Sequence, residues 1–324
     1  MTTSTDTCRI CGNSENNKHH TAREMMFGTR EEFVYLECVS CGTLQLTEVP
    51  NLAPYYPKNY LSFDARSPTE KSIVHKIAAR LIGKYLVTGR SLSGKFIQGR
   101  LPGFANNLEP SLLHPIIKIK FDSKILDFGS GSGRLLTSLH YFGFTDLTGA
   151  DAFIDKDIFY PTGVKIYKRR LDEMDPGFDL IMLHHAFEHV PDPRETLTEI
   201  KRILNPDGTC LIRIPVKNYA WEKYGVDWVQ LDSPRHLFLY TENSLKLIAN
   251  ECGFEVADVV YDSSAFQFWG SEQYKQDIPL VLPNSGGEFT NTFSAERVAA
   301  WEAEAQKLNK EKRGDAAAFY LKHR

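Results

Sequence analysis

The sequence lacks several features that define whole classes of protein. Its 324 residues contain no apolar run approaching the roughly 20 residues of a membrane-spanning helix, and no internal repeat or low-complexity tract. Its amino-terminal segment is polar and threonine-rich, without the pattern of a secretory signal. The formal net charge of −3 argues against a chain-wide attraction to polyanions. These absences predict a cytoplasmic protein with no DNA partner.

Cysteine is scarce, and its placement is uneven. Two C-x-x-C-G motifs hold four of the six cysteines, Cys8, Cys11, Cys38 and Cys41, whereas Cys210 and Cys252 occur singly. Two such pairs allow four thiolates to converge tetrahedrally on one ion. The pattern predicts a closed, structural zinc site in residues 1–60. Disulfides are the competing interpretation, and a cytosolic chain disfavours them.

One glycine-rich run stands between a strand-like and a helix-like segment. Residues 124–128 are apolar, residues 134–140 have helical character, and the run between them reads Asp127, Phe128, Gly129, Ser130, Gly131, Ser132, Gly133. Alternate glycines let the backbone turn sharply and leave no Cβ between the main chain and a ligand at the helix amino terminus. The run predicts a cofactor cradle.

A carboxylate follows the next predicted strand. Asp151 lies 22 residues after Gly129 and closes the apolar stretch 146–150, with Ala152 behind it. In a doubly wound sheet this position lies beside the cofactor ribose, whose hydroxyls a carboxylate can bind. Asp151 is therefore the predicted ribose ligand, while Asp155 and Asp157 are competing candidates.

The remaining pattern alternates strands with helices, which predicts an α/β fold with a doubly wound, mostly parallel sheet. The expected strands cover residues 164–167, 178–183, 209–215 and 254–261, with helices after Asp192 and Thr241. We expect a cysteine domain over 1–60, a basic helical linker over 61–118, a catalytic domain over 119–285 with an insertion over 216–240, and a helical tail over 286–324.

The spacing of the glycine-rich run resembles the first motif of class I S-adenosylmethionine-dependent methyltransferases, because an acidic residue stands two positions before Gly129. Residues 178–193, FDLIMLHHAFEHVPDP, are similar to the fourth-strand region of small-molecule methyltransferases. The resemblance implies S-adenosylmethionine as cofactor. It also implies that His184 lies at the cofactor and that Leu171 and Asp172 lie near the adenine.

Histidines near the expected acceptor side supply candidate general bases. Removal of a hydroxyl proton during methyl transfer needs a positioned base, and histidine is the natural one at neutral pH. His189 ranks first because Glu188 precedes it, His236 is its rival, and His185 is a further candidate. A structural role for these histidines is the alternative, and metal binding by His185 and His189 lacks an evident third ligand.

Aromatic residues gather in two places that could contact an acceptor. Residues 55–63 resemble the segment after the zinc knuckles in bacterial methyltransferases of surface-polysaccharide synthesis, and residues 233–240 resemble their acceptor-side loop. In that loop Arg235 could hold a carboxylate or phosphate. Trp221, Tyr224 and Trp228 could form a sugar pocket under a lid, and core packing is the alternative.

Two further segments have helical patterns. Residues 71–100 contain seven Lys or Arg and no acid, with apolar residues spaced for one helical face. This basic helix could approach a lipid-linked acceptor at the inner face of an anionic membrane, or it could pack on the sheet. Residues 294–312 predict a peripheral helix or a homodimer contact.

These features together predict a methyltransferase that uses S-adenosylmethionine to O-methylate a sugar, either nucleotide-linked or in a bacterial surface glycan. One alternative is an RNA methyltransferase that uses the zinc knuckles to bind RNA, although residues 184–187 do not match the motif used on exocyclic amines. Sugar C-methylation is disfavoured by chain length. A cofactor-binding scaffold without catalysis is the remaining alternative.

Overall fold

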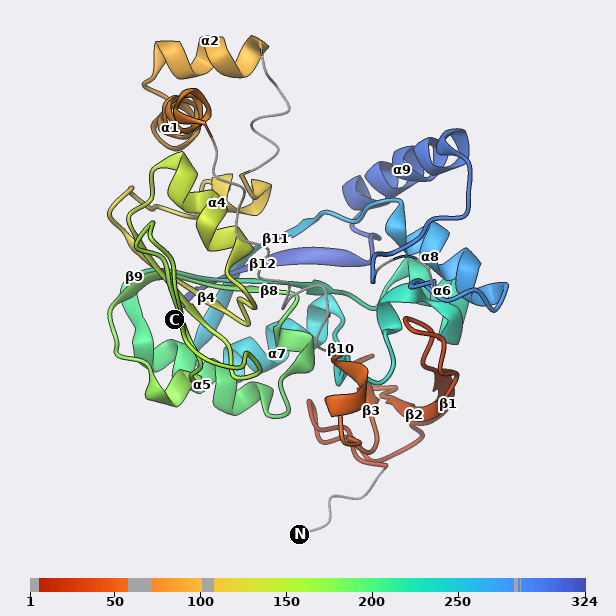
Figure 1. The fold of residues 1–324 in the computed structure, drawn as a ribbon. Coiled ribbons are helices and arrows are strands. Elements are labelled where there is room, and N and C mark those ends of the chain that lie inside the picture. Colours follow the sequence, from red (N-terminus) through yellow and green to blue (C-terminus); the bar gives the residue numbers. More distant parts are fainter. Residues whose placement is uncertain (1–5, 58–71, 101–107, 283–284, 286) are drawn as a thin grey trace. The chain divides into compact units, whose positions relative to one another are not determined.

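The computed structural model describes residues 6–57, 72–100, 108–282, 285 and 287–324 (Figure 1). These residues form two compact units. The first unit comprises the described residues within Met1–Leu61, His185–Arg194 and Arg213–Phe319. The second comprises those within Ser62–His184, Glu195–Ile212 and Tyr320–Arg324. The boundaries of the two units do not coincide with the four segments predicted from the sequence, because each unit is made of three separate stretches of the chain.

The second unit is built on a mostly parallel sheet. Its strand order is β9-β8-β4-β5-β7-β6. The strands are β4 (Lys124–Phe128), β5 (Asp146–Ala150), β6 (Ile158–Phe159), β7 (Lys165–Tyr167), β8 (Phe178–His184) and the part of β9 (Leu204–Pro215) up to Ile212. Strand β4 pairs in parallel with β5 and β8, and β6 is antiparallel to β7. The predicted α/β class and parallel sheet are confirmed.

Helix α4 (Arg134–Phe142) follows β4 in the second unit and buries Leu136, Leu139 and Phe142. It ends at Gly143, whose φ of +112° favours glycine. The other elements of this unit are α1 (Ile73–Thr88), α2 (Leu92–Arg100), the 3-10 helices at Pro110–Leu113 and Leu171–Glu173, and most of α5 (Pro193–Ile203). The helix predicted over 134–140 is thus present and two residues longer.

The first unit contains an antiparallel sheet of order β1-β2-β3-β10, which the sequence analysis did not predict. The strands are β1 (Lys18–Arg23), β2 (Glu32–Glu37), β3 (Leu44–Leu46) and β10 (Phe238–Leu239). Strand β10 pairs with β3 from almost 200 residues away in the sequence, with Phe238 opposite Gln45. This pairing fixes the segment around His236 to the amino-terminal region.

The rest of the first unit includes strands in the order β11-β12-β9 together with four helices. The elements are α6 (Tyr219–Tyr224), α7 (Glu242–Glu251), β11 (Phe254–Tyr261), α8 (Phe266–Lys275), α9 (Ala295–Lys310) and the start of β12 (Ala316–His323). Short 3-10 helices lie at Ala53–Tyr55, Phe187–His189, Gly225–Asp227 and Val229–Leu231. Thr241 and Ser294 cap α7 and α9 by accepting a backbone N–H, as their sequence positions predict.

Two sequence predictions are wrong. The tail over 286–324 is not helical throughout, because Ala316–His323 forms strand β12. The strand expected over 209–215 begins too late, because β9 starts at Leu204 and includes residues 205–208. In both places pairing within a sheet overrides the local preference of Ala, Asn, Pro and Gly.

Part of the predicted aromatic segment and the first residue of the basic segment fall in 58–71, which lies outside the described residues. Across the described helices, none is both long enough and apolar enough to cross a bilayer.

Candidate functional site

The cofactor loop, which we define as Asp127–Gly133, joins β4 to α4 in the second unit. Its glycines all have positive φ, namely +77° at Gly129, +52° at Gly131 and +78° at Gly133. A Cβ at Gly133 would lie 2.5 Å from the Cδ1 of Ile166 on β7, so only glycine fits there. The glycines predicted from the sequence are therefore needed for backbone conformation and for close packing.

Asp151 contacts the cofactor loop directly. Its Oδ2 accepts a hydrogen bond of 2.9 Å from the Gly131 N–H, and its Oδ1 accepts one of 2.8 Å from the Phe153 N–H. Its rival Asp157 instead accepts from the Lys168 N–H, at 2.8 Å. The parallel register of β4 and β5 explains this arrangement, because Phe128 and Ala150 are partners at the carboxyl ends of the strands.

Asp127 is buried within this loop. Burial, and after it the neighbouring charge of Asp151, together raise the pKa of its carboxyl to about 8. The buried Ser130 hydroxyl has no hydrogen-bond partner among the residues that the structure describes. Unsatisfied polar groups beside an open glycine turn fit a polar cofactor at this position.

The other predicted cofactor residues also belong to the second unit. Leu171 and Asp172 form the 3-10 helix Leu171–Glu173, where Leu171 is buried and the Asp172 carboxylate pairs with Arg170 at 2.7 Å. His184 is the last residue of β8, which runs parallel to β4. Phe128 ends β4, and Ala152 follows Asp151 as an exposed residue. Their roles toward the cofactor stay predictions.

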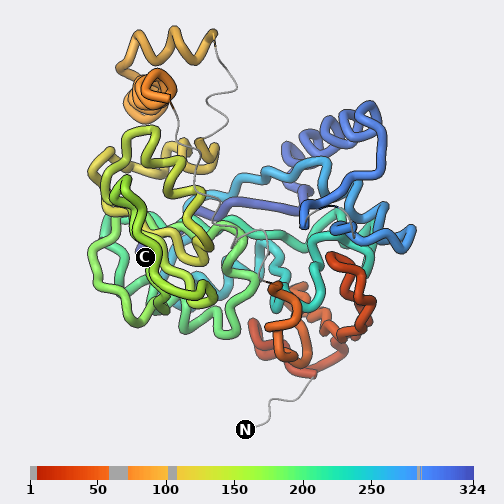
Figure 2. Tube along the Cα trace, viewed as in Figure 1, coloured from red at the N-terminus to blue at the C-terminus, as the bar shows by residue number. Residues whose placement is uncertain are grey.

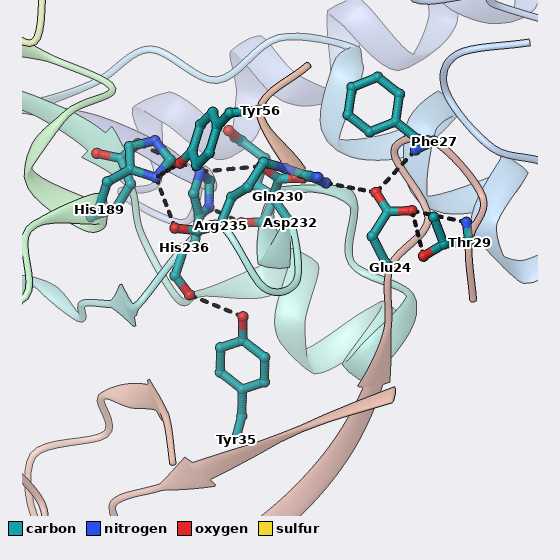
Figure 3. Close-up of polar contacts among 11 residues, drawn as sticks. Glu24, Phe27, Thr29, Tyr35, Tyr56, His189, Gln230, Asp232, Arg235 and His236 are labelled. Carbon is teal, nitrogen blue, oxygen red and sulfur yellow. Dashed lines mark hydrogen bonds and ion pairs between the residues drawn. The ribbon is translucent and has the colours of Figure 1, made fainter. Parts of the chain in front are cut away.

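Three polar side chains form the histidine cluster of the first unit, defined here as Glu188, His189 and His236 (Figure 3 shows both histidines). One ligand-type atom from each lies within 4.8 Å of the others. The His236 Nε2 lies 3.8 Å from a Glu188 oxygen, and the two imidazole centroids are 4.8 Å apart. The two histidines that the sequence analysis treated as rivals therefore belong to one group.

Backbone carbonyls set the tautomers of both histidines. The Nδ1 of His189 lies 2.8 Å from the Arg235 carbonyl oxygen, and the Nδ1 of His236 lies 2.8 Å from that of Gln230. A carbonyl can only accept, so each Nδ1 carries the hydrogen. In the neutral form of each ring, Nε2 then holds the lone pair that a base or a metal ligand needs.

Glu188 is fully buried, and its carboxylate makes no hydrogen bond within the described part of the chain. Burial opposes its ionisation, but His185, His189 and His236 outweigh that effect and lower the pKa of Glu188 to about 2. Burial lowers the pKa of His236 to about 4, although Asp232 opposes this. At neutral pH the cluster thus combines a buried carboxylate with a neutral His236, an arrangement suited to holding a proton or a cation.

His185 lies at the edge of this group. Its Nδ1 is 3.4 Å from a Glu188 oxygen, its Nε2 contacts Arg213, and it is exposed. Its φ of +50° is in the left-handed region. His189 is half-buried whereas Glu188 and His236 are buried, so His189 is the most accessible member of the cluster.

Arg235 is fully buried, and two carboxylates hold its guanidinium. Its Nη2 lies 2.6 Å from Asp232 and 3.0 Å from Glu24, and Glu24 also accepts from the Phe27 and Thr29 N–H groups (Figure 3). The predicted contact with an acceptor anion stays untested, and this pairing favours a structural role. Glu24 was not identified from the sequence, because its partner Arg235 lies 211 residues away, and Asp232, although only three residues before Arg235, belongs to no recognised motif.

The predicted sugar-pocket aromatics are all buried. Trp228 donates from Nε1 to Asp315 at 2.9 Å, Tyr224 donates to Glu272 at 3.1 Å, and Trp221 packs edge-on against His20. Tyr56 is placed differently, since it is half-buried and its hydroxyl lies 3.3 Å from the Nδ1 of His189. Tyr56 is therefore the aromatic residue that accompanies the histidine cluster.

The four motif cysteines converge as the sequence predicts. The Sγ atoms of Cys8 and Cys41 are 3.6 Å apart, those of Cys11 and Cys38 are 3.4 Å apart, and all four lie within 4.8 Å. Gly12 and Gly42 donate to the carbonyls of Cys8 and Cys38 at 2.9 Å, so the two knuckles have the same local geometry. Hydrogen bonding from Cys8 lowers the pKa of Cys41 to about 5. The group could hold a metal ion.

The parallel sheet, the glycine turn and the carboxylate after β5 define a nucleotide-binding α/β unit. Residues 98–259 match the family model described as a methyltransferase domain. This match covers half of the chain, and the chain belongs to this family. It is a methyltransferase that uses S-adenosylmethionine.

Curated relatives of this chain are ubiquinone biosynthesis O-methyltransferases. The protein of Pseudomonas aeruginosa strain LESB58 is 25% identical over 154 residues, which cover 42% of this chain and 66% of the relative. The protein of Rickettsia bellii strain OSU 85-389 is 30% identical over 126 residues, which cover 34% and 52%. The chain thus spans between half and two thirds of the length of these relatives.

Solved structures similar to this chain include S-adenosylmethionine-dependent methyltransferases of Thermotoga maritima and Archaeoglobus fulgidus. The first is 16% identical and covers 75% of this chain and all of its own, with a TM-score of 0.41. The second is also 16% identical and covers 71% and 94%, with a TM-score of 0.38.

Proposed function

We propose that this protein transfers a methyl group to an acceptor hydroxyl, with His189 as the general base. The observation that carries the proposal is the histidine cluster. His189 is half-buried in it, donates a hydrogen bond from Nδ1 to a backbone carbonyl oxygen, and is adjacent to the buried Glu188. A neutral Nε2 can take a hydroxyl proton, and a nearby carboxylate stabilises the imidazolium that results.

Bound S-adenosylmethionine would supply an electrophilic methyl group on a sulfonium and would leave as a neutral thioether. The Nε2 of His189 would take the hydroxyl proton as the acceptor oxygen bonds to the methyl carbon, and the electron pair of the broken carbon–sulfur bond would stay on sulfur. In this proposal the cofactor loop and Asp151 bind the cofactor, and Leu171, Asp172 and His184 line its adenine and methionine ends. His236 and Glu188 orient and charge-balance His189.

We propose a sugar hydroxyl as the acceptor, either in a nucleotide-linked sugar or in a bacterial glycan. Support comes from the resemblance of residues 55–63 and 233–240 to polysaccharide-associated enzymes and from Tyr56, whose ring lies edge-on to His189 with centroids 6.4 Å apart. Aromatic rings stack well on sugar faces. The names of the curated relatives favour a second candidate, a hydroxylated intermediate of ubiquinone biosynthesis.

A transfer assay separates these acceptors. The purified protein is incubated with methyl-labelled S-adenosylmethionine and, in parallel, with a panel of nucleotide sugars, polyprenylated phenols or total RNA. We expect label on a sugar oxygen, located by mass spectrometry and NMR, and loss of that product in His189→Gln. Label on a phenol would support the second candidate acceptor. Label on RNA would contradict both candidates and identify RNA as the acceptor.

We also propose that Cys8, Cys11, Cys38 and Cys41 bind one structural zinc ion. Their sulfur spacing suits the roughly 2.3 Å bonds of a tetrahedral thiolate site. Metal analysis of the purified chain should find one zinc per molecule, and Cys11→Ser should lose it. Cys252→Ser is the matched control and should retain the ion. Full zinc content in Cys11→Ser would contradict the assignment.

A further inference from the structure

Helices α1 and α2 in the second unit combine positive charge with exposed apolar side chains. Residues Ile73–Arg100 contain six Lys or Arg and no Asp or Glu. Both helices are drawn in orange in Figure 2, outside the grey segments. None of the groups that bind cofactor or acceptor in the proposed function lies in these helices, so their surface needs a separate explanation.

Glycines fix which faces of the two helices turn inward. A Cβ at Gly94 would lie 1.9 Å from the Leu81 carbonyl oxygen, so α2 packs closely on α1 at this point. A Cβ at Gly83 would lie 2.3 Å from the Phe142 carbonyl oxygen, so α1 packs on the end of α4. Ala79 and Ile82 are buried on the same side. The inward face is thus fully specified by close contacts.

Five apolar residues of these two helices are exposed. Ile73 is 76% exposed, Leu92 87% and Phe96 62%, and Val74 and Ile77 are also exposed. On α1 the exposed positions Ile73, Ile77, Arg80 and Lys84 follow a 4-3-4 spacing and therefore share one face. On α2 the Arg100 guanidinium lies 4.8 Å from the Phe96 ring centroid. On α1 the exposed apolar residues precede Arg80 and Lys84, whereas on α2 the exposed apolar and basic residues are interleaved, with Lys95 next to Phe96.

We propose that this face, the α1–α2 surface, docks on an anionic phospholipid bilayer. The apolar side chains insert at the boundary between headgroups and acyl chains, and the basic side chains pair with lipid phosphates. Exposed aliphatic side chains would be left without partners on a nucleic acid, which is bound by phosphate contacts and aromatic stacking. The absence of any acid between Ile73 and Arg100 gives the charge complementarity that a bilayer needs.

Vesicle flotation with the full-length protein tests this proposal. Vesicles contain either phosphatidylcholine alone or phosphatidylcholine mixed with phosphatidylglycerol, at low and at high salt. We expect binding to the mixed vesicles only, and weaker binding at high salt. The triple variant Lys84→Gln/Lys95→Gln/Arg100→Gln should bind on the order of 100-fold more weakly, since each basic residue near such a surface contributes roughly fivefold.

Matched variants distinguish insertion from charge alone. Phe96→Ser should weaken vesicle binding, whereas Phe159→Ser should not, because Phe159 is equally exposed at 62% but lies outside the α1–α2 surface. Lys307→Gln on α9 is the corresponding charge control. Thermal unfolding checks that every variant is folded. Equal binding by Phe96→Ser and Phe159→Ser, or equal binding to both vesicle types, would overturn the proposal, as would preferential binding of the surface to RNA.

Discussion

The cofactor loop and the histidine cluster are built in opposite ways. The loop consists of seven consecutive residues, and it is defined by its backbone conformation, with glycines at φ of +77°, +52° and +78°. The cluster consists of side chains from Glu188, His189 and His236, and backbone carbonyls of Gln230 and Arg235 orient it. A contiguous backbone motif is visible in a sequence, whereas a side-chain cluster from separate segments is visible only once the chain has folded.

The largest expected effect concerns catalysis at the cluster. His189→Gln removes the proposed base while keeping a hydrogen-bonding side chain of similar size. We expect kcat for methyl transfer to fall about 100- to 10,000-fold, as is typical for the loss of a general base. Steady-state kinetics on the acceptor found in the transfer assay measures this. His185→Gln is the control, and an equal loss of kcat there would show that the base has been assigned to the wrong histidine.

The next effect concerns stability rather than chemistry. Arg235→Met leaves the carboxylates of Glu24 and Asp232 without their buried cation. Removal of one partner from a buried pair costs about 3–5 kcal/mol, so the free energy of unfolding should drop by this order in a denaturant titration. Arg170→Met, which breaks an exposed pair with Asp172, should cause no measurable change. Similar behaviour of both variants would show that the buried pairing does not stabilise the first unit.

A pH dependence should distinguish the loop from the cluster. Asp127 has a folded-state pKa of about 8 against a usual value of 3.8, so the folded chain keeps a proton that the unfolded chain releases between these values. Its contribution to stability is therefore complete below pH 4 and is lost as the pH rises to about 8. Asp127→Asn cannot titrate and should flatten this part of the stability profile. An unchanged slope would mean that Asp127 is ionised in the folded state.

The smallest effect concerns support of His236. Tyr35 donates its hydroxyl hydrogen to the His236 carbonyl at 2.9 Å, inside the first unit (Figure 3). Tyr35→Phe should lower the free energy of unfolding by about 1 kcal/mol and also reduce kcat. Tyr320→Phe removes an equivalent buried bond to the Ser111 carbonyl, also 2.9 Å, and should affect stability alone. If kcat falls equally in both variants, the amino-terminal sheet does not position the cluster.

Much of the fold could be predicted because its elements have strong local patterns. The apolar runs of β4, β5 and β8, the glycine turn and the Thr241 cap each specify their own conformation. Strand β12 could not be predicted, since Ala316–Ala318 favours a helix in isolation and becomes a strand only through pairing with neighbours. The pairing of β10 with β3 could not be predicted for the same reason.

The candidate site divides in the same way. The loop, Asp151 and the four cysteines were predicted from spacing, because each is defined by a short motif or by the end of a strand. The histidines were identified individually, but their shared contact with Glu188 depends on the path of the chain between His189 and His236. Glu24 carried no local signal, since its partner Arg235 is 211 residues away, whereas Asp232 lies only three residues before Arg235 and its burial became evident only in the folded chain.

Calorimetric titration of S-adenosylmethionine into three forms of the protein tests the division between loop and cluster most directly. Wild type and His189→Gln should bind with equal affinity, whereas Asp151→Ala should bind about 10- to 100-fold more weakly, because it loses the carboxylate that holds the loop and that we propose binds the ribose. Weaker binding by His189→Gln, or unchanged binding by a folded Asp151→Ala, would contradict the assignment of cofactor binding to the loop and of proton transfer to the cluster.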